Sequence, residues 1–321
     1  MVRTVTLDDV LRARAAIAGR LLRTPTLSSR TLSEATGARV HLKAELFQRT
    51  GSFKPRGVLA RVESLTAEER KRGVVTWSAG NAAQAVAWAA AAAGVGCRVF
   101  MWRTASPLKV AATRGYGAEV DVEAESAAEA HERLLAHVEE TGAVFVHPFD
   151  DPVLHAGHGS VGLEVLEDVP EAAVVVVPIA GGGLIAGVAT AVKGLRPETR
   201  VVGVEPEGAA TMTAALAAGA VVPIVPKSIA DGLGAPFVGE GTLAVCHELV
   251  DEVVLVSDVE IEEAFRFLYT RAKLACEPAG AAATAALLAG KVPLEADEEV
   301  VSVVSGGNVA PETASAILAS R

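Results

Sequence analysis

The chain has 321 residues, of which 50% are hydrophobic and only 4% aromatic, and its formal net charge is −10. This length is enough for two domains or one large domain, with a core built mainly from Ala, Val and Leu. The negative charge gives no electrostatic help to binding a phosphate backbone, so nucleic acid is not expected as a partner.

The cysteine pattern and the beginning of the chain point to an ordinary protein of a reducing compartment. Cys97, Cys246 and Cys276 are scattered without a CxxC pair, which disfavours a disulfide framework or a zinc site and favours a cytoplasmic location. Residues 1–22 carry acids and arginines throughout and predict a first helix, not a targeting segment. The Ala-rich run at 82–97 predicts a buried helix and turn, not a membrane span.

Short runs of β-branched residues recur along the chain, and they are continuous rather than alternating. Such runs are typical of strands buried on both faces of a parallel sheet. They lie at residues 73–76, 97–101, 143–146, 174–177, 201–204 and 300–304. Helical patterns lie between them, at residues 82–93, 127–140, 183–193 and 259–272. Strands that alternate with helices predict an α/β fold.

The first chemically informative segment is TGSFKPRG, residues 50–57. A lone lysine at the start of a helix is usually a surface residue. In a partly apolar pocket, however, desolvation lowers the pKa of a lysine such as Lys54, and the neutral amine can attack an aldehyde. Phe53 is placed to cover one face of a bound ring.

A second segment, SAGN at residues 78–81, follows the strand that ends at Thr76 and begins the helix at Ala82. Ser78 and Asn81 are residue types that cap helices, and free N–H groups at a helix start suit a carboxylate. Taken alone, the segment predicts only an N-cap.

The third segment, AGGGL at residues 180–184, follows the strand at 174–177. A strand, a glycine turn and a helix in this order point free backbone N–H groups at an anion such as phosphate. The spacing does not fit a P-loop, because no Gly-Lys-Ser/Thr follows. It also does not fit GxGxxG, although Glu205 stands where the acidic partner of that motif would be sought.

The fourth segment, SGGN at residues 305–308, follows the buried strand at 300–304, where ligands of parallel sheets bind. The Ser305 hydroxyl can hydrogen-bond a pyridine nitrogen but cannot hold it protonated as an aspartate would. A weaker electron sink favours elimination of a β-leaving group. A reactive lysine, a phosphate turn and a turn for a heterocycle together predict a pyridoxal 5′-phosphate (PLP) site.

Together these segments resemble the fold-type-II PLP enzymes, and within them the serine/threonine dehydratase and serine racemase group. The resemblance extends over nearly the whole chain. Its ordered motifs are TPTL (24–27), HLKAE (41–45), TGSFKPRG (50–57), SAGN (78–81), HPFDDP (147–152), AGGGL (180–184), GVEPEG (203–208), ADGL (230–233), EPAGA (277–281) and SGGN (305–308).

The resemblance implies a two-domain α/β fold like that of tryptophan synthase β, in which each domain is a mostly parallel sheet flanked by helices. A large PLP-binding domain would comprise residues 1–66 and 149–321. A small mobile domain, residues 67–148, would close over the substrate. A homodimer is implied, with a small amino acid as substrate and no membrane partner. The chain ends soon after SGGN, so no C-terminal regulatory domain is expected.

The resemblance also implies a role for each motif. Lys54 would carry PLP as a Schiff base and later act as the base at Cα, in an ammonia-lyase that eliminates water from L-threonine or L-serine to give a 2-oxo acid and ammonia. The other implied contacts are Phe53 on the ring, Asn81 at its O3′, Ser305 at its nitrogen, Glu277 near the cofactor, Ala180, Gly181, Gly182, Gly183 and Leu184 at the phosphate, and Ser78, Ala79, Gly80 and Asn81 at the substrate carboxylate.

Several positions depart from the family pattern. Ala79 stands where serine racemases have an acid/base serine, so racemisation should be poor. Ala180 replaces the first of four glycines. Ala82 and His158 stand where a histidine and a glutamine are common, which predicts a reshaped pocket.

A metal site is not expected. The cation site of racemase-like members would use Glu205, the carbonyl of Ala209 and an acid at position 211, where this chain has Thr211. His155 and His158 are spaced like metal ligands, but no third ligand accompanies them.

Other functions stay open at this point. The substrate could be another β-hydroxy amino acid, such as 3-hydroxyaspartate or a phenylserine, or the enzyme could be an amino-acid racemase. A β-replacement synthase is less favoured because its asparagine loop usually differs. A nucleotide-binding oxidoreductase would leave Lys54 without a role. A non-catalytic sensor is disfavoured because Lys54, Asn81 and Ser305 occur together.

Overall fold

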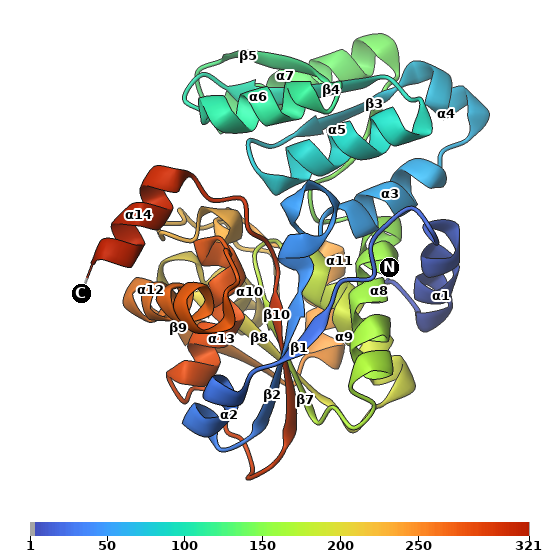
Figure 1. Cartoon of the computed structure of the whole chain (residues 1–321). Helices are drawn as coiled ribbons and strands as arrows, with labels where there is room; N and C mark the ends of the chain where they lie inside the picture. Colours follow the sequence, from blue (N-terminus) through green and yellow to red (C-terminus); the bar gives the residue numbers. More distant parts are fainter. Residues whose placement is uncertain (1–3, 321) are drawn as a thin grey trace.

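A computed structural model describes residues 4–320; residues 1–3 and 321, which begin and end the predicted large domain, lie outside the described residues. The strands form two separate sheets, each flanked by helices (Figure 1). The predicted α/β fold with mostly parallel sheets is confirmed.

The larger sheet has six strands in the order β1-β2-β10-β7-β8-β9. Within this sheet, only β1 is antiparallel to its neighbour. The bounds are β1 Thr26–Ser28, β2 Arg39–Ala44, β7 Val174–Pro178, β8 Arg200–Pro206, β9 Glu252–Val256 and β10 Glu299–Val304. Since β10 lies between β2 and β7, the segments that follow these three strands meet at one edge of the sheet.

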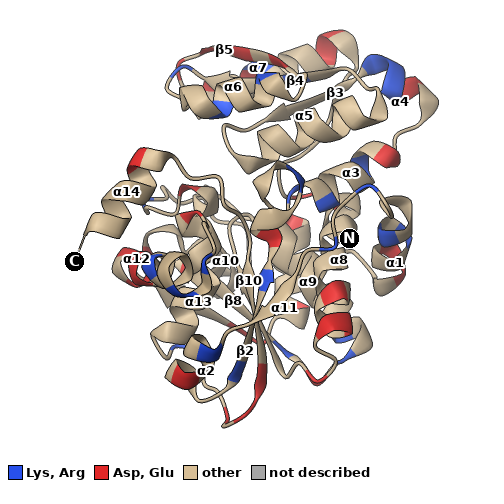
Figure 2. Cartoon of the chain, viewed as in Figure 1, with Lys and Arg blue, Asp and Glu red and all other residues tan. Residues whose placement is uncertain are grey.

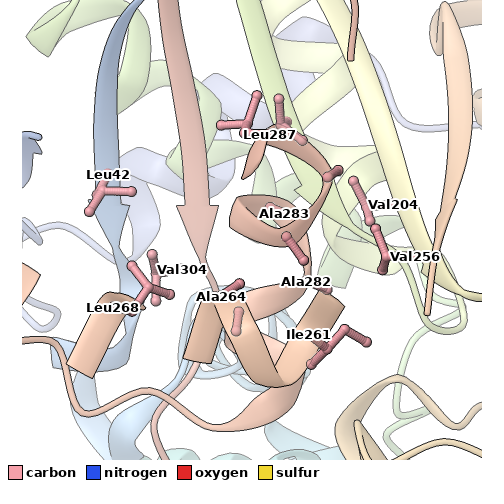
Figure 3. Packing of buried hydrophobic residues seen from close by; sticks show 14 of the residues in the cluster. Leu42, Val204, Val256, Ile261, Ala264, Leu268, Ala282, Ala283, Leu287 and Val304 are labelled. Carbon is pink, nitrogen blue, oxygen red and sulfur yellow. The ribbon is translucent and has the colours of Figure 1, made fainter. Parts of the chain in front are cut away.

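Two layers of helices cover the faces of the larger sheet. One layer packs Val175, Val177 and Val301 against apolar residues of α8 and α9. On the opposite face, α13 packs against Val204 and Val304 and is itself covered by α12 (Figure 3). The helices of this part of the chain are α1 Leu7–Ala16, α2 Arg30–Thr36, α3 Pro55–Glu63, α8 Pro152–Asp168, α9 Gly183–Leu195, α10 Thr211–Ala218, α11 Glu240–Leu249, α12 Asp258–Phe267, α13 Pro278–Leu288 and α14 Pro311–Ala319.

The smaller sheet has four parallel strands in the order β5-β4-β3-β6. Its strands are β3 Val74–Trp77, β4 Cys97–Trp102, β5 Glu119–Ala124 and β6 Val144–Phe145, and its helices are α4 Ala67–Arg72, α5 Asn81–Ala93, α6 Pro107–Gly115 and α7 Ala127–Thr141. Alternate residues of β4 face opposite layers, with Val99 and Met101 toward α5 and α6 and Phe100 toward α7. All four strands lie within residues 67–148.

Short helical turns connect these elements near the edge of the larger sheet. They are η1 Glu45–Phe47, η2 Arg49–Gly51, η3 Glu207–Ala209, η4 Asp231–Leu233 and the π-helical turn η5 Leu268–Ala272. The helix predicted at 259–272 therefore corresponds to α12 and η5. Its start is set by a capping box, in which Ser257 and Glu260 each accept a hydrogen bond from the other's backbone N–H.

Two largely buried helices carry no charged side chains. α5 and α13 carry no Lys, Arg, Asp or Glu, whereas the outer helix α4 carries charges of both signs (Figure 2). Small alanine side chains let α5 and α13 approach their neighbours closely. Within residues 4–320, no helix is long and apolar enough to cross a membrane.

Candidate active site

A cavity of about 340 Å³ lies between the two sheets, at the carboxyl ends of the strands of the larger sheet. A cavity of this size can hold a small organic ligand. The structure brings all thirteen residues of the predicted cofactor and substrate sites to its lining, namely Phe53, Lys54, Ser78, Ala79, Gly80, Asn81, Ala180, Gly181, Gly182, Gly183, Leu184, Glu277 and Ser305.

Lys54 is held at the cavity by a pairing between its own loop and the loop after β10. Ser52 and Gly306 form an isolated antiparallel bridge, and the N–H of Phe53 donates to the carbonyl oxygen of Ser305 at 3.0 Å. Pro55 then occupies the first turn of α3, where its missing N–H costs nothing. The two predicted motifs are therefore parts of one site.

The buried side chain of Arg56 fixes the start of α3. Its guanidinium donates to both carboxylate oxygens of Glu45 at 2.7 and 2.8 Å and to both of Glu164 at 2.7 and 2.8 Å. Glu45 follows β2 and Glu164 belongs to α8. Two bidentate ion pairs in the interior give well-defined geometry, so Lys54, just before this anchor, has a fixed backbone position.

The amine of Lys54 has an environment that favours its neutral form. Burial lowers its pKa from 10.5 to about 8, against an opposing effect of the Glu277 charge. Its Nζ donates to the carbonyl oxygen of Pro148 at 2.8 Å and lies 5.2 Å from the centre of the Phe53 ring. Near neutral pH a useful fraction of this amine is therefore unprotonated and nucleophilic.

The glycine turn at the start of α9 is shaped by close packing on Phe149. A Cβ on Gly181 would lie 2.2 Å from the Phe149 ring, and one on Gly183 would lie 2.6 Å from its carbonyl oxygen. Gly182 has a φ of +92°, which favours glycine. No acceptor among residues 4–320 is bonded to the N–H groups of Gly181, Gly182 or Gly183, so they are available to an anion.

Asn81, from the smaller sheet's layer, is joined to two loops of the larger sheet. Its Nδ2 donates to Glu277 Oε1 at 2.7 Å, and its Oδ1 accepts from Asn308 Nδ2 at 2.8 Å. Asn308 Nδ2 also donates to the Thr50 carbonyl oxygen at 2.7 Å. Because an amide nitrogen has two N–H groups, Asn81 retains one for a ligand in the cavity.

Glu277, which accepts a hydrogen bond from Asn81, has a carboxyl group with a strongly shifted pKa. Burial, together with the negative charge of Asp231, raises its pKa from 4.5 to about 7. A Cβ on Gly306 would lie 2.4 Å from Glu277 Oε1, so a larger residue there would displace the carboxyl group. Glu277 is thus positioned to be partly protonated at neutral pH beside the cavity.

The SAGN segment does not form the predicted helix cap, in which a side chain would accept a hydrogen bond from the first turn of α5. Gly80 is the N-cap of α5, and no side chain caps the helix. Ser78 Oγ instead accepts from the N–H of Gly80 at 3.1 Å, and Asn81 turns toward Glu277. The prediction of side-chain capping is wrong because tertiary partners compete for these side chains. The first N–H groups of α5 consequently remain uncapped at the cavity.

Comparison with known proteins assigns the chain to a family. The family described as "Pyridoxal-phosphate dependent enzyme" matches residues 17–306. The chain belongs to this family. It is 44% identical over 306 residues to the L-threonine ammonia-lyase of Thermotoga maritima, covering 95% of this chain and 76% of that protein. It is 41% identical over 307 residues to the L-threonine dehydratase catabolic TdcB of Escherichia coli, covering 95% and 93%.

Solved structures agree with this assignment. A threonine deaminase from T.th. superposes with a TM-score of 0.89 at 41% identity, covering 95% of this chain and 99% of that one. The protein is therefore a PLP-dependent enzyme, as the sequence motifs predict. The site has what PLP needs: an amine for the aldehyde, unpartnered N–H groups for the phosphate and the Asn81 amide.

The two unusual positions of the pocket have different surroundings. Ala82 lines the cavity. His158 is not part of the lining; it lies against Phe53, with ring centroids 4.8 Å apart in an edge-to-face arrangement. Its Nδ1 accepts from the N–H of Gly57 at 3.1 Å, and burial holds its pKa well below the usual value. A neutral His158 therefore supports the ring of Phe53 from outside the cavity.

The residues at the positions considered for a cation, Glu205 and Thr211, form hydrogen bonds within the protein. The carboxylate of Glu205 accepts from the N–H of Met212 at 2.6 Å and from the N–H and hydroxyl of Thr213 at 2.9 and 2.7 Å. The Thr211 hydroxyl donates to the carbonyl oxygen of Ala235 at 3.0 Å. Among residues 4–320, no three His, Cys, Asp or Glu side chains are grouped to hold a metal ion. In the described residues, the side chains of Glu205 and Thr211 therefore bond to the protein itself.

Several lining residues were not predicted as site residues. Phe149 and Asp231 lie in the HPFDDP and ADGL motifs, which offered a signal for them. Trp77, Trp102 and Lys109 come from the smaller sheet's layer and carry no motif. Their position follows only from the way the two sheets face each other.

Proposed function

We propose that this protein is a threonine/serine ammonia-lyase that converts L-threonine, and L-serine, into a 2-oxo acid and ammonia by β-elimination of water. The observation that carries the proposal is the convergence of Lys54, the AGGGL turn, Asn81 and Ser305 on one cavity. The relatives named for threonine, at 41–44% identity over most of the chain, support the choice of substrate.

PLP, when bound, supplies the electron sink for breaking the bond between Cα and its hydrogen. The amine of Lys54, with a pKa of about 8, is suited to take that proton near neutral pH. The uncapped N–H groups at the start of α5 and the Ser78 hydroxyl would hold the substrate carboxylate. The Ser305 hydroxyl cannot keep a ring nitrogen protonated, which favours loss of the β-hydroxyl.

Racemisation is disfavoured by the residue on the other face of the substrate. A racemase needs a second acid/base group that returns a proton from the side opposite Lys54. Ala79 lines the cavity in the SAGN segment and has no group that can carry a proton. We infer that a substrate that has given up its Cα proton loses its β-hydroxyl before it is reprotonated with inverted configuration.

We also propose that residues 67–148 act as a small domain that moves against a large domain of residues 1–66 and 149–321. Contacts such as Asn81 with Glu277 and Asn308 join the two sheets across the cavity. Closure at these contacts would exclude water from the reacting substrate. A homodimer in the cytoplasm completes the proposal; the unpaired Cys97, Cys246 and Cys276 suit a reducing compartment.

The test is release of 2-oxo acid from a panel of L-threonine, L-serine, 3-hydroxyaspartate and phenylserine by the purified holoenzyme. The proposal predicts the highest kcat/KM for L-threonine or L-serine and no turnover by Lys54→Ala. A matched control, Lys227→Ala, removes an exposed lysine and should retain full activity. Full activity in Lys54→Ala, or turnover of phenylserine alone, would contradict it.

A further inference from the structure

An ion pair at the edge of the cavity joins the two sheets and takes no part in the proposed elimination. Lys109 Nζ lies 2.6 Å from Asp231 Oδ2. Lys109 belongs to α6, which lies beside the smaller sheet (Figure 1). Asp231 begins η4, in the part of the chain that follows β8 of the larger sheet. Both residues line the cavity. The pair thus places one positive and one negative charge next to any ligand there.

The two partners differ in how much water they meet. The side chain of Lys109 is 24% exposed and that of Asp231 is 65% exposed. An ion pair with so exposed a member contributes little to stability. Among residues 4–320, Asp231 is the only group bonded to the Lys109 ammonium, which has three N–H donors. Lys109 therefore keeps donors free, and Asp231 is the acid in direct contact with its ammonium group.

Both charges act within the site itself. Asp231 raises the pKa of the buried Glu277 and Lys109 lowers it, so both lie within electrostatic reach of the residue that holds Asn81. A Cβ on Gly232, the next residue after Asp231, would lie 3.7 Å from Glu277 Oε1. The pair is therefore next to the substrate loop rather than on a remote surface.

We propose that the Lys109–Asp231 pair determines the charge selectivity for the substrate side chain. Asp231 neutralises Lys109 and repels a second carboxylate, so the cavity accepts β-hydroxy amino acids with neutral side chains and rejects dicarboxylic ones. Removing the Asp231 charge leaves Lys109 as an unpaired cation on the cavity wall. That cation is a ready-made binding point for a carboxylate on the substrate side chain.

The experiment compares the wild-type holoenzyme, Asp231→Asn and the double variant Asp231→Asn/Lys109→Met on L-threonine and L-threo-3-hydroxyaspartate. The readout is the ratio of kcat/KM for hydroxyaspartate to that for threonine, because this ratio cancels a general loss of activity. We expect Asp231→Asn to raise the ratio about tenfold or more, and the double variant to return it to the wild-type value. An unchanged ratio in Asp231→Asn, or a raised ratio in the double variant, would overturn the proposal.

This inference rests on the proposed function, and a binding measurement separates the two. Succinate, a dicarboxylate without an amine, can be titrated while the fluorescence of Trp77 and Trp102, both in the cavity wall, is followed. Asp231→Asn should bind succinate about tenfold more tightly than the wild type, and the double variant should lose that gain. Failure of the wild type to release 2-oxo acid from threonine would contradict the proposed function only. Equal succinate affinity in all three proteins would contradict the role of Lys109 and Asp231.

Discussion

Replacing Glu277 with Gln should change how the stability of the cofactor-free protein depends on pH. The folded protein raises the pKa of Glu277 from 4.5 to about 7. A carboxyl group with a raised pKa contributes stability below its unfolded pKa, and this contribution is lost as the pH rises through the folded pKa. At about 1.36 kcal/mol per pH unit, the loss amounts to about 3 kcal/mol. A glutamine at position 277 keeps an oxygen that can accept from the Asn81 amide. Because glutamine does not titrate, the variant does not lose this stability as the pH rises.

The assay is urea unfolding of the wild type and Glu277→Gln at several pH values from about 5 to about 8. The unfolding free energy of the variant should rise relative to the wild type by most of that amount. Glu260→Gln is the control. Burial raises the pKa of Glu260, but the hydrogen bonds from Lys291 and Ser257 outweigh burial, so its pKa in the folded protein lies below 4.5. The Glu260 carboxylate therefore stays charged from pH about 5 to about 8, and the stability difference between this variant and the wild type should not change with pH. A pH-independent difference between Glu277→Gln and the wild type would refute the reasoning.

Three further predictions follow from the cavity and its surroundings. Ser305→Asp should protonate the ring nitrogen and slow elimination about tenfold relative to side reactions, measured as 2-oxo acid per side product; an unchanged ratio contradicts the role of the serine. Ala79→Ser should raise serine racemisation about tenfold, measured by chiral chromatography; no increase contradicts the role given to Ala79. Dialysis against EDTA should leave Tm and activity unchanged, because hydrogen bonds occupy Glu205 and Thr211; a loss restored by Mg²⁺ contradicts this.

The buried strands could be predicted because valine runs mark strands covered on both faces. β7 and β10, buried along almost their whole length, matched the predicted runs. β2 was missed because Lys43 interrupts its pattern. That lysine is fully buried, and its charge is balanced by Glu164 at 2.7 Å, far along the chain in α8. β5 was missed because acids alternate with its apolar residues.

The parts of the site that depend on backbone shape could also be predicted. Glycines at 181–183 and 306–307 stand out because only glycine fits the close approaches there. The position of Lys109 and Asp231 beside the cavity could not be predicted, because their ion pair joins two sheets that meet only in the folded chain. The partners of Asn81 were missed for the same reason: Glu277 and Asn308 reach it from distant loops.

The measurement that tests the central claim most directly is the absorption spectrum of the purified protein before and after addition of L-threonine, with 2-oxobutanoate followed in the same cuvette. We expect a visible cofactor band that depends on Lys54, shifts on addition of threonine and is accompanied by 2-oxobutanoate release. A protein that shows no such band even after PLP is added, or a band that persists unchanged in Lys54→Ala, would contradict it.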